Sequence, residues 1–324
     1  MRTTTSRIAL VCALIAGAFV GSVPTSARQS ALQPGAQVCD DPDRSVSLFA
    51  EPLGDGRVGY GTAPGEASIP GPTLEMVEGE CLAVTLTNDA KRRVSIHSHG
   101  VDYTVTSDGT PLNDSCVAPG RSKTYFFQAH LPGTRSDGTV DAGSAGYWHY
   151  HDHCLGTEHG TGGVYAGLFG AFVVRRAGDP VPDRTCVLVM IKTTFNLRKD
   201  PATPRCESNV GDRVEFVVIG HGDTFHTFHL HGHRWTDNRT GMPATVNDAT
   251  RLIDNKVVGP ADSFGFQVIA GEHVGPGPWM YHCHVQGHSD AGMSGIFVVN
   301  TPDGRRTPAT IEALRELRRG THSH

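Results

Sequence analysis

The densest group of side chains able to bind a metal lies in residues 279–284 (WMYHCH), followed by His288 and Met293. A thiolate, several imidazoles and a thioether are together the soft ligands that copper prefers. Side chains alternate along a strand, so Cys283 can bind one metal while its two His neighbours reach another. We therefore assign Cys283, His288 and Met293 to one copper, with His226 recruited from upstream. A structural zinc site also uses Cys and His, but a Met ligand and a single Cys argue against it.

An internal repeat relates two halves of the chain. The segment HSHG at residues 97–100 recurs as HLHG at 229–232, an offset of 132 residues. The segment GYWHYHDH at 146–153 recurs as GPWMYHCH at 277–284, an offset of 131. An insertion around Leu131 to Gly143 in the first copy restores the register. Two homologous domains are therefore expected to meet near Arg175 to Arg184, a polar linker that contains proline.

Comparison of the two copies separates two kinds of metal site. Where the second copy has His226, Cys283, His288 and Met293, the first has Val94, Asp152, Thr157 and Gly162. The His-x-His pairs survive in both copies: His97 and His99, His151 and His153, His229 and His231, His282 and His284. Hence the second domain holds a mononuclear site, and both domains contribute to a shared cluster. Three coppers are a natural count for these eight imidazoles, with open positions for an oxygen species.

Short β-rich runs such as residues 82–86, separated by Gly, Pro and Asn, predict an all-β chain of antiparallel sandwiches. A chain of 324 residues is long enough for two domains. We predict domain 1 over 38–178, domain 2 over 183–300, and a tail over 301–324. A short amphipathic helix is expected within that tail, over Ile311 to Arg319, with Thr307 and Pro308 before it and Gly320 after it.

The N-terminal residues 1–27 have the features of a secretory signal peptide: early arginines, an apolar run and a small-residue cleavage site. They predict a secreted or extracytoplasmic protein. No second apolar run of membrane length follows, and a net charge of −5 gives no indication of nucleic-acid binding. Neither a membrane nor a nucleic acid is therefore expected as a partner.

Six cysteines remain once the signal segment and Cys283 are set aside: Cys39, Cys81, Cys116, Cys154, Cys186 and Cys206. In an exported protein they suggest disulfides, but the sequence does not choose among fifteen pairings. Cys154, beside a His cluster, could instead be a buried thiol. The unassigned histidines are expected to be outer-sphere or surface groups: His130, His149, His159, His221, His233 and His273.

These motifs resemble those of two-domain multicopper oxidases of the small bacterial laccase type, over nearly the whole mature chain. The resemblance implies two cupredoxin-like Greek-key β-sandwich domains and a blue type 1 copper on His226, Cys283, His288 and axial Met293. It places the type 2 copper on His97 and His229. The type 3 pair would take the other imidazoles: His99, His151, His153, His231, His282 and His284.

The same resemblance implies a laccase (benzenediol:oxygen oxidoreductase) with four coppers per functional unit: one type 1, one type 2 and two type 3. Phenolic or aromatic donors would give single electrons to the type 1 copper, and Cys283 would pass them to the cluster, which reduces dioxygen to water. It also suggests a homotrimer with clusters at the subunit interfaces.

Protons must also reach the cluster, and carboxylates are the usual carriers in proteins of this resemblance. The candidates are Asp108 and Asp254, although Asp108 in Ser107-Asp108-Gly109 is equally a turn residue. Tyr103, four residues after His99, could donate an electron or a hydrogen bond near the type 2 copper, or simply pack in a strand.

Three alternatives remain. Copper nitrite reductases also have two β-domains, but they place the type 1 site in the first domain and lack the His-Cys-His arrangement. A cuprous-ion oxidase typically carries Met-rich insertions, whereas the six methionines here are scattered. A copper-binding protein without turnover would keep every ligand. The physiological reductant, the redox potential and the pH optimum do not follow from the sequence.

Overall fold

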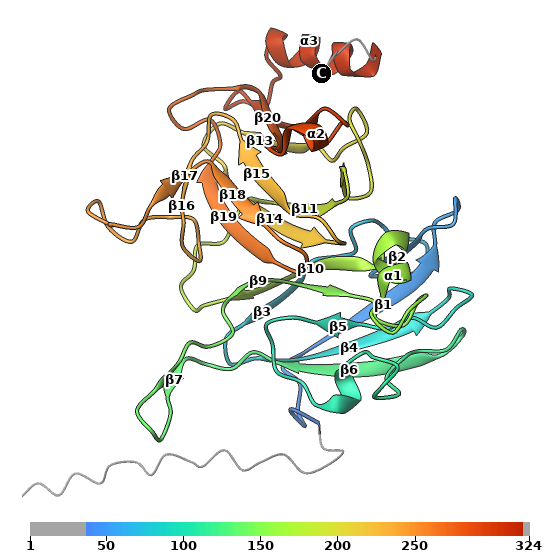
Figure 1. The fold of residues 1–324 in the computed structure, drawn as a ribbon. Coiled ribbons are helices and arrows are strands. Elements are labelled where there is room, and N and C mark those ends of the chain that lie inside the picture. The colour runs from blue at the N-terminus through green and yellow to red at the C-terminus, as the bar shows by residue number, and fades with distance from the viewer. Residues whose placement is uncertain (1–36, 320–324) are drawn as a thin grey trace, which may run out of the picture. The chain divides into compact units, whose positions relative to one another are not determined.

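The structure is a computed structural model that describes residues 37–319, and it consists mainly of strands (Figure 1). The predicted all-β class is confirmed. The predicted signal peptide, residues 1–27, lies outside the described residues. Within residues 37–319, no helix has both the length and the apolar character needed to cross a bilayer.

Two four-stranded sheets form the first sandwich, in the orders β2-β1-β4-β6 and β3-β10-β9-β5. Their strands are β1 (Arg44–Pro52), β2 (Val58–Gly61), β3 (Leu74–Val77), β4 (Cys81–Asn88), β5 (His97–Ser98), β6 (Ser122–Gln128), β9 (Gly146–His151) and β10 (Phe169–Arg175). Buried side chains from both sheets, such as Val84, Phe127 and Phe172, meet in one apolar core. Burial of these apolar side chains stabilises the packing of the two sheets.

The second sandwich pairs a four-stranded sheet, β12-β11-β14-β19, with a five-stranded one, β13-β21-β20-β15-β18. Their strands are β11 (Arg184–Ile191), β12 (Thr194–Phe195), β13 (Cys206–Asn209), β14 (Arg213–His221), β15 (His226–Leu230), β18 (Asn255–Val258), β19 (Ser263–Ile269), β20 (Gly277–Cys283) and β21 (Ser294–Asn300). A small sheet of β16 (Trp235–Thr236) and β17 (Leu252–Ile253) lies outside it.

The strand pairings of the two sandwiches follow the same scheme. The parallel pair β1 and β4 corresponds to β11 and β14, and the antiparallel pair β4 and β6 corresponds to β14 and β19. In the other sheets, β5 and β9 correspond to β15 and β20, both antiparallel. The repeat predicted from the motifs is therefore also a repeat of strand pairing. The prediction of purely antiparallel sandwiches is wrong, because β1 pairs with β4, and β11 with β14, in parallel; the composition of a strand does not reveal the direction of its neighbour.

Elements outside this scheme account for the remaining sequence features. The predicted insertion contains a hairpin of β7 (Gly133–Thr134) and β8 (Val140–Asp141). Short helices follow β9 and β20, namely α1 (Thr161–Ala166) and α2 (Gln286–Ser289), and a 3-10 turn, η1, covers Val105–Ser107. The predicted C-terminal helix is confirmed as α3 (Pro308–Arg319), whose Leu314 and Leu317 pack on Val298 of β21.

Three disulfides pair the six cysteines: Cys39–Cys81, Cys116–Cys154 and Cys186–Cys206. The alternative that Cys154 is a buried thiol is wrong, because the fold brings Cys116 within bonding reach, with the two Cα atoms 6.0 Å apart. Within residues 37–319, Cys283 is the only free cysteine, and it is buried.

A buried carboxylate cross-links the two sandwiches. Glu215 of β14 has no exposed surface, and Arg175 donates two hydrogen bonds to its oxygens, at 2.8 and 3.0 Å. The hydroxyl of Tyr147 in β9 donates a third, at 2.8 Å. Apolar side chains of β9 and β10 pack there against those of β11 and β14. The contact between the two domains therefore combines apolar packing with a buried ion pair.

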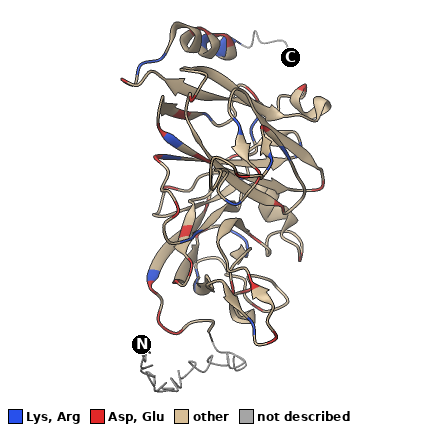
Figure 2. Cartoon of the chain, turned by 90° about the vertical axis from the view of Figure 1, so that its left-hand side faces the viewer, with Lys and Arg blue, Asp and Glu red and all other residues tan. Residues whose placement is uncertain are grey.

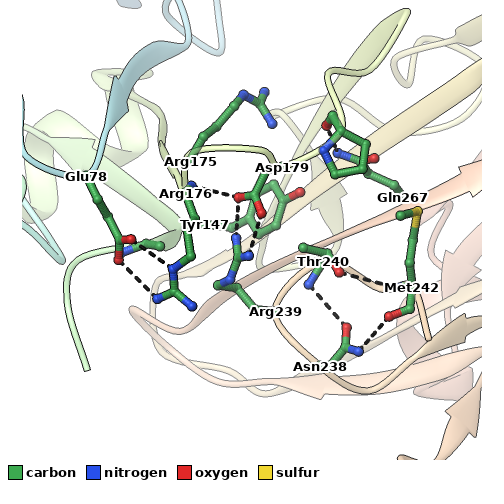
Figure 3. Close-up of polar contacts among 12 residues, drawn as sticks. Glu78, Tyr147, Arg175, Arg176, Asp179, Asn238, Arg239, Thr240, Met242 and Gln267 are labelled. Carbon is green, nitrogen blue, oxygen red and sulfur yellow. Dashed lines mark hydrogen bonds and ion pairs between the residues drawn. The ribbon is translucent and has the colours of Figure 1, made fainter. Parts of the chain in front are cut away.

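The linker between the sandwiches is held by further ion pairs (Figure 3). Arg176 contacts Glu78 at 2.8 Å, and Arg239 contacts Asp179 at 2.5 Å. Ion pairs thus connect the predicted linker to both domains. Figure 2 shows Lys and Arg interspersed with Asp and Glu along both domains.

Candidate metal centres

A mononuclear ligand set lies inside the second sandwich. The Sγ atom of Cys283 is 3.6 Å from Nδ1 of His288 and 3.9 Å from Nδ1 of His226. Cys283 and Met293 are both fully buried in the same core, and the amide of Cys283 donates to the carbonyl of Met293 at 3.1 Å. Thiolate, two imidazoles and a thioether form the donor set of a blue-copper site, so these residues fit the ion.

Local structure places each of these ligands. His226 opens β15 and Cys283 closes β20, two strands paired in register at Phe228 and Cys283. The single turn of α2 then brings His288 back toward the thiol. Burial, followed by the neighbouring His288, lowers the pKa of His226 to about 4. His226 is therefore neutral at ordinary pH, as a metal ligand must be.

The first sandwich gathers imidazoles on the strand pair β5 and β9. His97 pairs in register with His151, and ligand atoms of His97, His99 and His151 all lie within 4.8 Å of one another. The Nε2 atoms of His99 and His151 are 3.2 Å apart. The His153 ring lies 4.6 Å from that of His97, measured between centroids.

The second sandwich repeats this arrangement on β15 and β20. His229 pairs with His282, and ligand atoms of His229, His231 and His282 lie within 4.8 Å of one another. The Nε2 atoms of His231 and His282 are again 3.2 Å apart, and the His284 ring lies 5.4 Å from that of His229. Each sandwich therefore carries one set of four paired imidazoles, built in the same way, and each set is called a half-cluster below.

Backbone carbonyls orient the rings in both halves. Nδ1 donates to a carbonyl in each of four equivalent residues: His97 to Asp108 at 2.7 Å, His229 to Asp254 at 2.7 Å, His151 to Asp152 at 3.0 Å and His282 to Cys283 at 2.9 Å. A carbonyl only accepts, so the proton lies on Nδ1 and Nε2 is left for a metal. Burial also lowers the pKa of His99, to about 4, and keeps this ring neutral.

The structure places the two candidate carboxylates and the candidate tyrosine beside His97 and His229. A carboxylate oxygen of Asp108 lies 3.6 Å from Nδ1 of His97, and one of Asp254 lies 3.9 Å from Nδ1 of His229. The Tyr103 ring is 5.9 Å from that of His97. Burial, with Asp108 adding to it, raises the pKa of Tyr103. Their roles in proton or electron delivery remain predictions.

Two buried histidines contact the first cluster, and the sequence left both without a specific position. His149 is only 1% exposed, stacks on His99 at 4.0 Å, and meets His221 edge-on at 4.8 Å. His149 could have been placed by strand alternation, because it shares a face of β9 with His151. His221 gave no such signal, since it comes from β14 of the other sandwich.

Asp152 of the first sandwich is the counterpart of Cys283 in the second sandwich. Its carboxylate is fully buried and accepts hydrogen bonds from the amides of Ser95 at 2.7 Å, Leu155 at 2.7 Å and Cys154 at 3.1 Å. Burial raises the pKa of Asp152 to about 6. A Cβ at Gly163 would lie 2.2 Å from this carboxylate, so the glycine makes room for it. Backbone donors, and not a metal, satisfy this position.

The two half-clusters lie apart within one chain. Across residues 37–319, no imidazole of the His97 set makes a ring contact with one of the His229 set. Members of both sets are partly exposed, including His97, His99, His229 and His231. Each half-cluster is thus partly exposed at the protein surface.

Comparisons with known proteins agree with this picture. Residues 65–179 and 181–303 each match a family described as multicopper oxidase. A probable nitrite reductase-hydroxylamine oxidoreductase fusion protein of Kuenenia stuttgartiensis is 32% identical over 276 residues, covering 78% of this chain and 30% of that protein. The chain spans only 22% to 30% of the length of the first curated relatives.

Solved structures share the fold. A blue copper oxidase from Nitrosomonas europaea has a TM-score of 0.57 and 24% identity, covering 84% of this chain and 94% of that chain. A copper nitrite reductase from the same organism has a TM-score of 0.58 and 19% identity, covering 82% of this chain and 98% of that chain. The fold is therefore shared with a blue copper oxidase and with a copper nitrite reductase, and it does not distinguish between them.

Proposed function

Because the chain belongs to the multicopper oxidases, with two cupredoxin domains, we propose that it is a laccase-type enzyme acting on small phenolic or aromatic donors. Donor oxidation, one electron at a time, would be coupled to four-electron reduction of dioxygen to water. One observation carries the proposal: Cys283 lies in the mononuclear set, while its neighbour His282 lies in an imidazole half-cluster. When bound, copper supplies the electron transfer and the oxygen chemistry.

The chain's own residues define the path into the protein. His226 is fully buried and His288 is partly exposed, so an electron from outside would enter at the His288 edge. Phe225, directly before His226, is 68% exposed, and Val285 beside α2 is 38% exposed. An exposed aromatic ring next to the ligand set supports flat aromatic donors, which pack on such surfaces.

The proposal includes four coppers per functional unit and a homotrimer. The type 1 ion would be held by His226, Cys283, His288 and Met293, and three more ions by the eight paired imidazoles. Two open half-clusters in one chain support sharing between chains, because head-to-tail contacts that close give a ring. An extracytoplasmic location is also proposed, and the three disulfides support it.

Subunit sharing predicts complementation between two inactive variants. One carries His151→Ala and His153→Ala, and the other His282→Ala and His284→Ala. In any mixed trimer, one interface joins an intact first domain to an intact second domain, so about one third of wild-type activity is expected. Co-expressed chains with different tags, purified as mixed assemblies, provide the measurement.

The control mixes the His151→Ala, His153→Ala chain with a chain that carries His97→Ala and His99→Ala. Both defects then lie in the same half-cluster, and no activity should return. A fully inactive mixed trimer in the first experiment would contradict sharing between chains, and so would an active isolated monomer.

Oxygen consumption by the copper-loaded protein with 2,6-dimethoxyphenol tests the activity itself. Four donors should be oxidised for each dioxygen, with no peroxide released. Turnover of nitrite with no oxygen uptake would instead place the chain with the nitrite reductases. Stable copper binding without any turnover would indicate a binding protein.

A further inference from the structure

The first sandwich is hollow where the second holds its mononuclear ligand set. A cavity of about 500 Å³ opens between the β1–β2 turn, the loop after β4, and α1. Its lining includes Val94 and Gly162, the counterparts of His226 and Met293 in the repeat. Figure 1 shows α1 beside β2 at this end of the sandwich. The cavity thus borders two of the four positions that correspond to the mononuclear ligands of the second sandwich.

The lining does not fit a metal ion, because no His, Cys, Met, Asp or Glu side chain contributes to it. Asp152, the counterpart of Cys283, lies outside the lining, and both of its oxygens accept hydrogen bonds from backbone amides. The walls are apolar, with contributions from Val58, Ala90, Leu155 and Ala166. A volume of this size lies within the range of cavities that bind small organic molecules, which are usually lined by apolar groups and a few polar ones.

The rim of the cavity carries positive charge. Arg57, Lys91 and Arg92 all border it. Arg57 is neutralised by Asp55 at 2.9 Å, whereas no acidic side chain of residues 37–319 forms an ion pair with Lys91 or Arg92. Two unneutralised cations above an apolar floor complement a molecule with a flat apolar body and one anionic group.

We propose that this cavity binds small aromatic carboxylates, with the ring against Leu155 and Ala166 and the carboxylate between Lys91 and Arg92. The site contains none of the proposed copper ligands, so binding does not depend on turnover. It is therefore a second small-molecule site in the chain, separate from the donor surface at Phe225. Its existence is independent of the proposed oxidase activity.

Calorimetric titration of the copper-loaded protein with 1-naphthoate tests the proposal, because this probe has no phenol to oxidise. One molecule per chain should bind. The double charge reversal Lys91→Glu and Arg92→Glu should weaken binding roughly tenfold or more, since it replaces attraction with repulsion at short range. Arg121→Glu is the matched control, an exposed arginine outside the cavity, and should change little.

Two further variants distinguish the site from other surfaces. Ala166→Leu should reduce 1-naphthoate binding by filling the cavity, while the blue absorption and oxygen consumption stay at wild-type levels. Phe225→Ala should leave 1-naphthoate binding unchanged. The proposal is overturned if the wild-type protein does not bind, if Arg121→Glu weakens binding as much as the double reversal, or if only Phe225→Ala weakens it.

Discussion

Cys283→Ser should abolish the blue colour and the oxidation of phenolic donors expected of the copper-loaded protein, while copper should stay bound to the imidazole half-clusters. A neutral hydroxyl cannot replace a thiolate as a soft copper ligand. The loss of activity should exceed the roughly 10–100-fold cost of removing an outer-sphere partner, because a direct ligand is lost. Visible absorption, paramagnetic resonance, copper content per chain and oxygen uptake provide the readouts.

The matched control for this experiment is Met280→Leu, in the same strand. Met280 is 40% exposed and similar to Leu in volume, so colour and activity should both persist. Circular dichroism should show that Cys283→Ser folds, since Ser is close to Cys in size. Loss of copper from the imidazole clusters together with the blue site would contradict the assignment of two separate ligand sets.

Arg175→Ala should lower the free energy of unfolding by about 3–5 kcal/mol, the usual cost of leaving a buried charge without its partner. The reason is Glu215, which is fully buried and receives two hydrogen bonds from this guanidinium. Denaturant titration followed by tryptophan fluorescence measures the change. A loss below about 1 kcal/mol, the size of an exposed ion pair, would show that Glu215 is not held by this charge.

An exposed ion pair serves as the control. Arg251 contacts Asp237 at 3.1 Å, but its side chain is 75% exposed, so Arg251→Ala should cost about 1 kcal/mol at most. Combining Arg175→Met with Glu215→Gln should recover much of the stability, because no buried charge then remains. Failure of this double variant to exceed Arg175→Ala would point to packing, and not charge, as the source of the loss.

Most of the candidate site could be predicted from the sequence, because the chain contains the same unit twice. The joint absence of all four mononuclear ligands from the first copy, with Asp152 in place of Cys283, assigns the mononuclear set to the second domain. The disulfide partners could not be predicted in this way, since pairing depends on which loops the fold brings together. Cys116 and Cys154 meet only because the loops before β6 and after β9 converge.

The contacts that other residues make with the ligand histidines could not be predicted from the sequence either. The contact of His221 with His149 depends on how β14 of one sandwich packs against β9 of the other, and no local pattern encodes it. The sequence named Asp108 and Asp254 as candidate proton carriers, but not the contacts that their backbone carbonyls make with His97 and His229. Every residue has a backbone carbonyl, so side-chain identity does not encode these contacts.

The salt-bridged contact around Glu215 also has a consequence for assembly. It holds the two sandwiches at one angle, and therefore sets the angle between their two imidazole surfaces. In the proposed ring, that angle would determine how many subunits close the ring. A buried carboxylate that touches no copper ligand would then set the number of subunits, and with it the number of complete oxygen-reducing centres per particle.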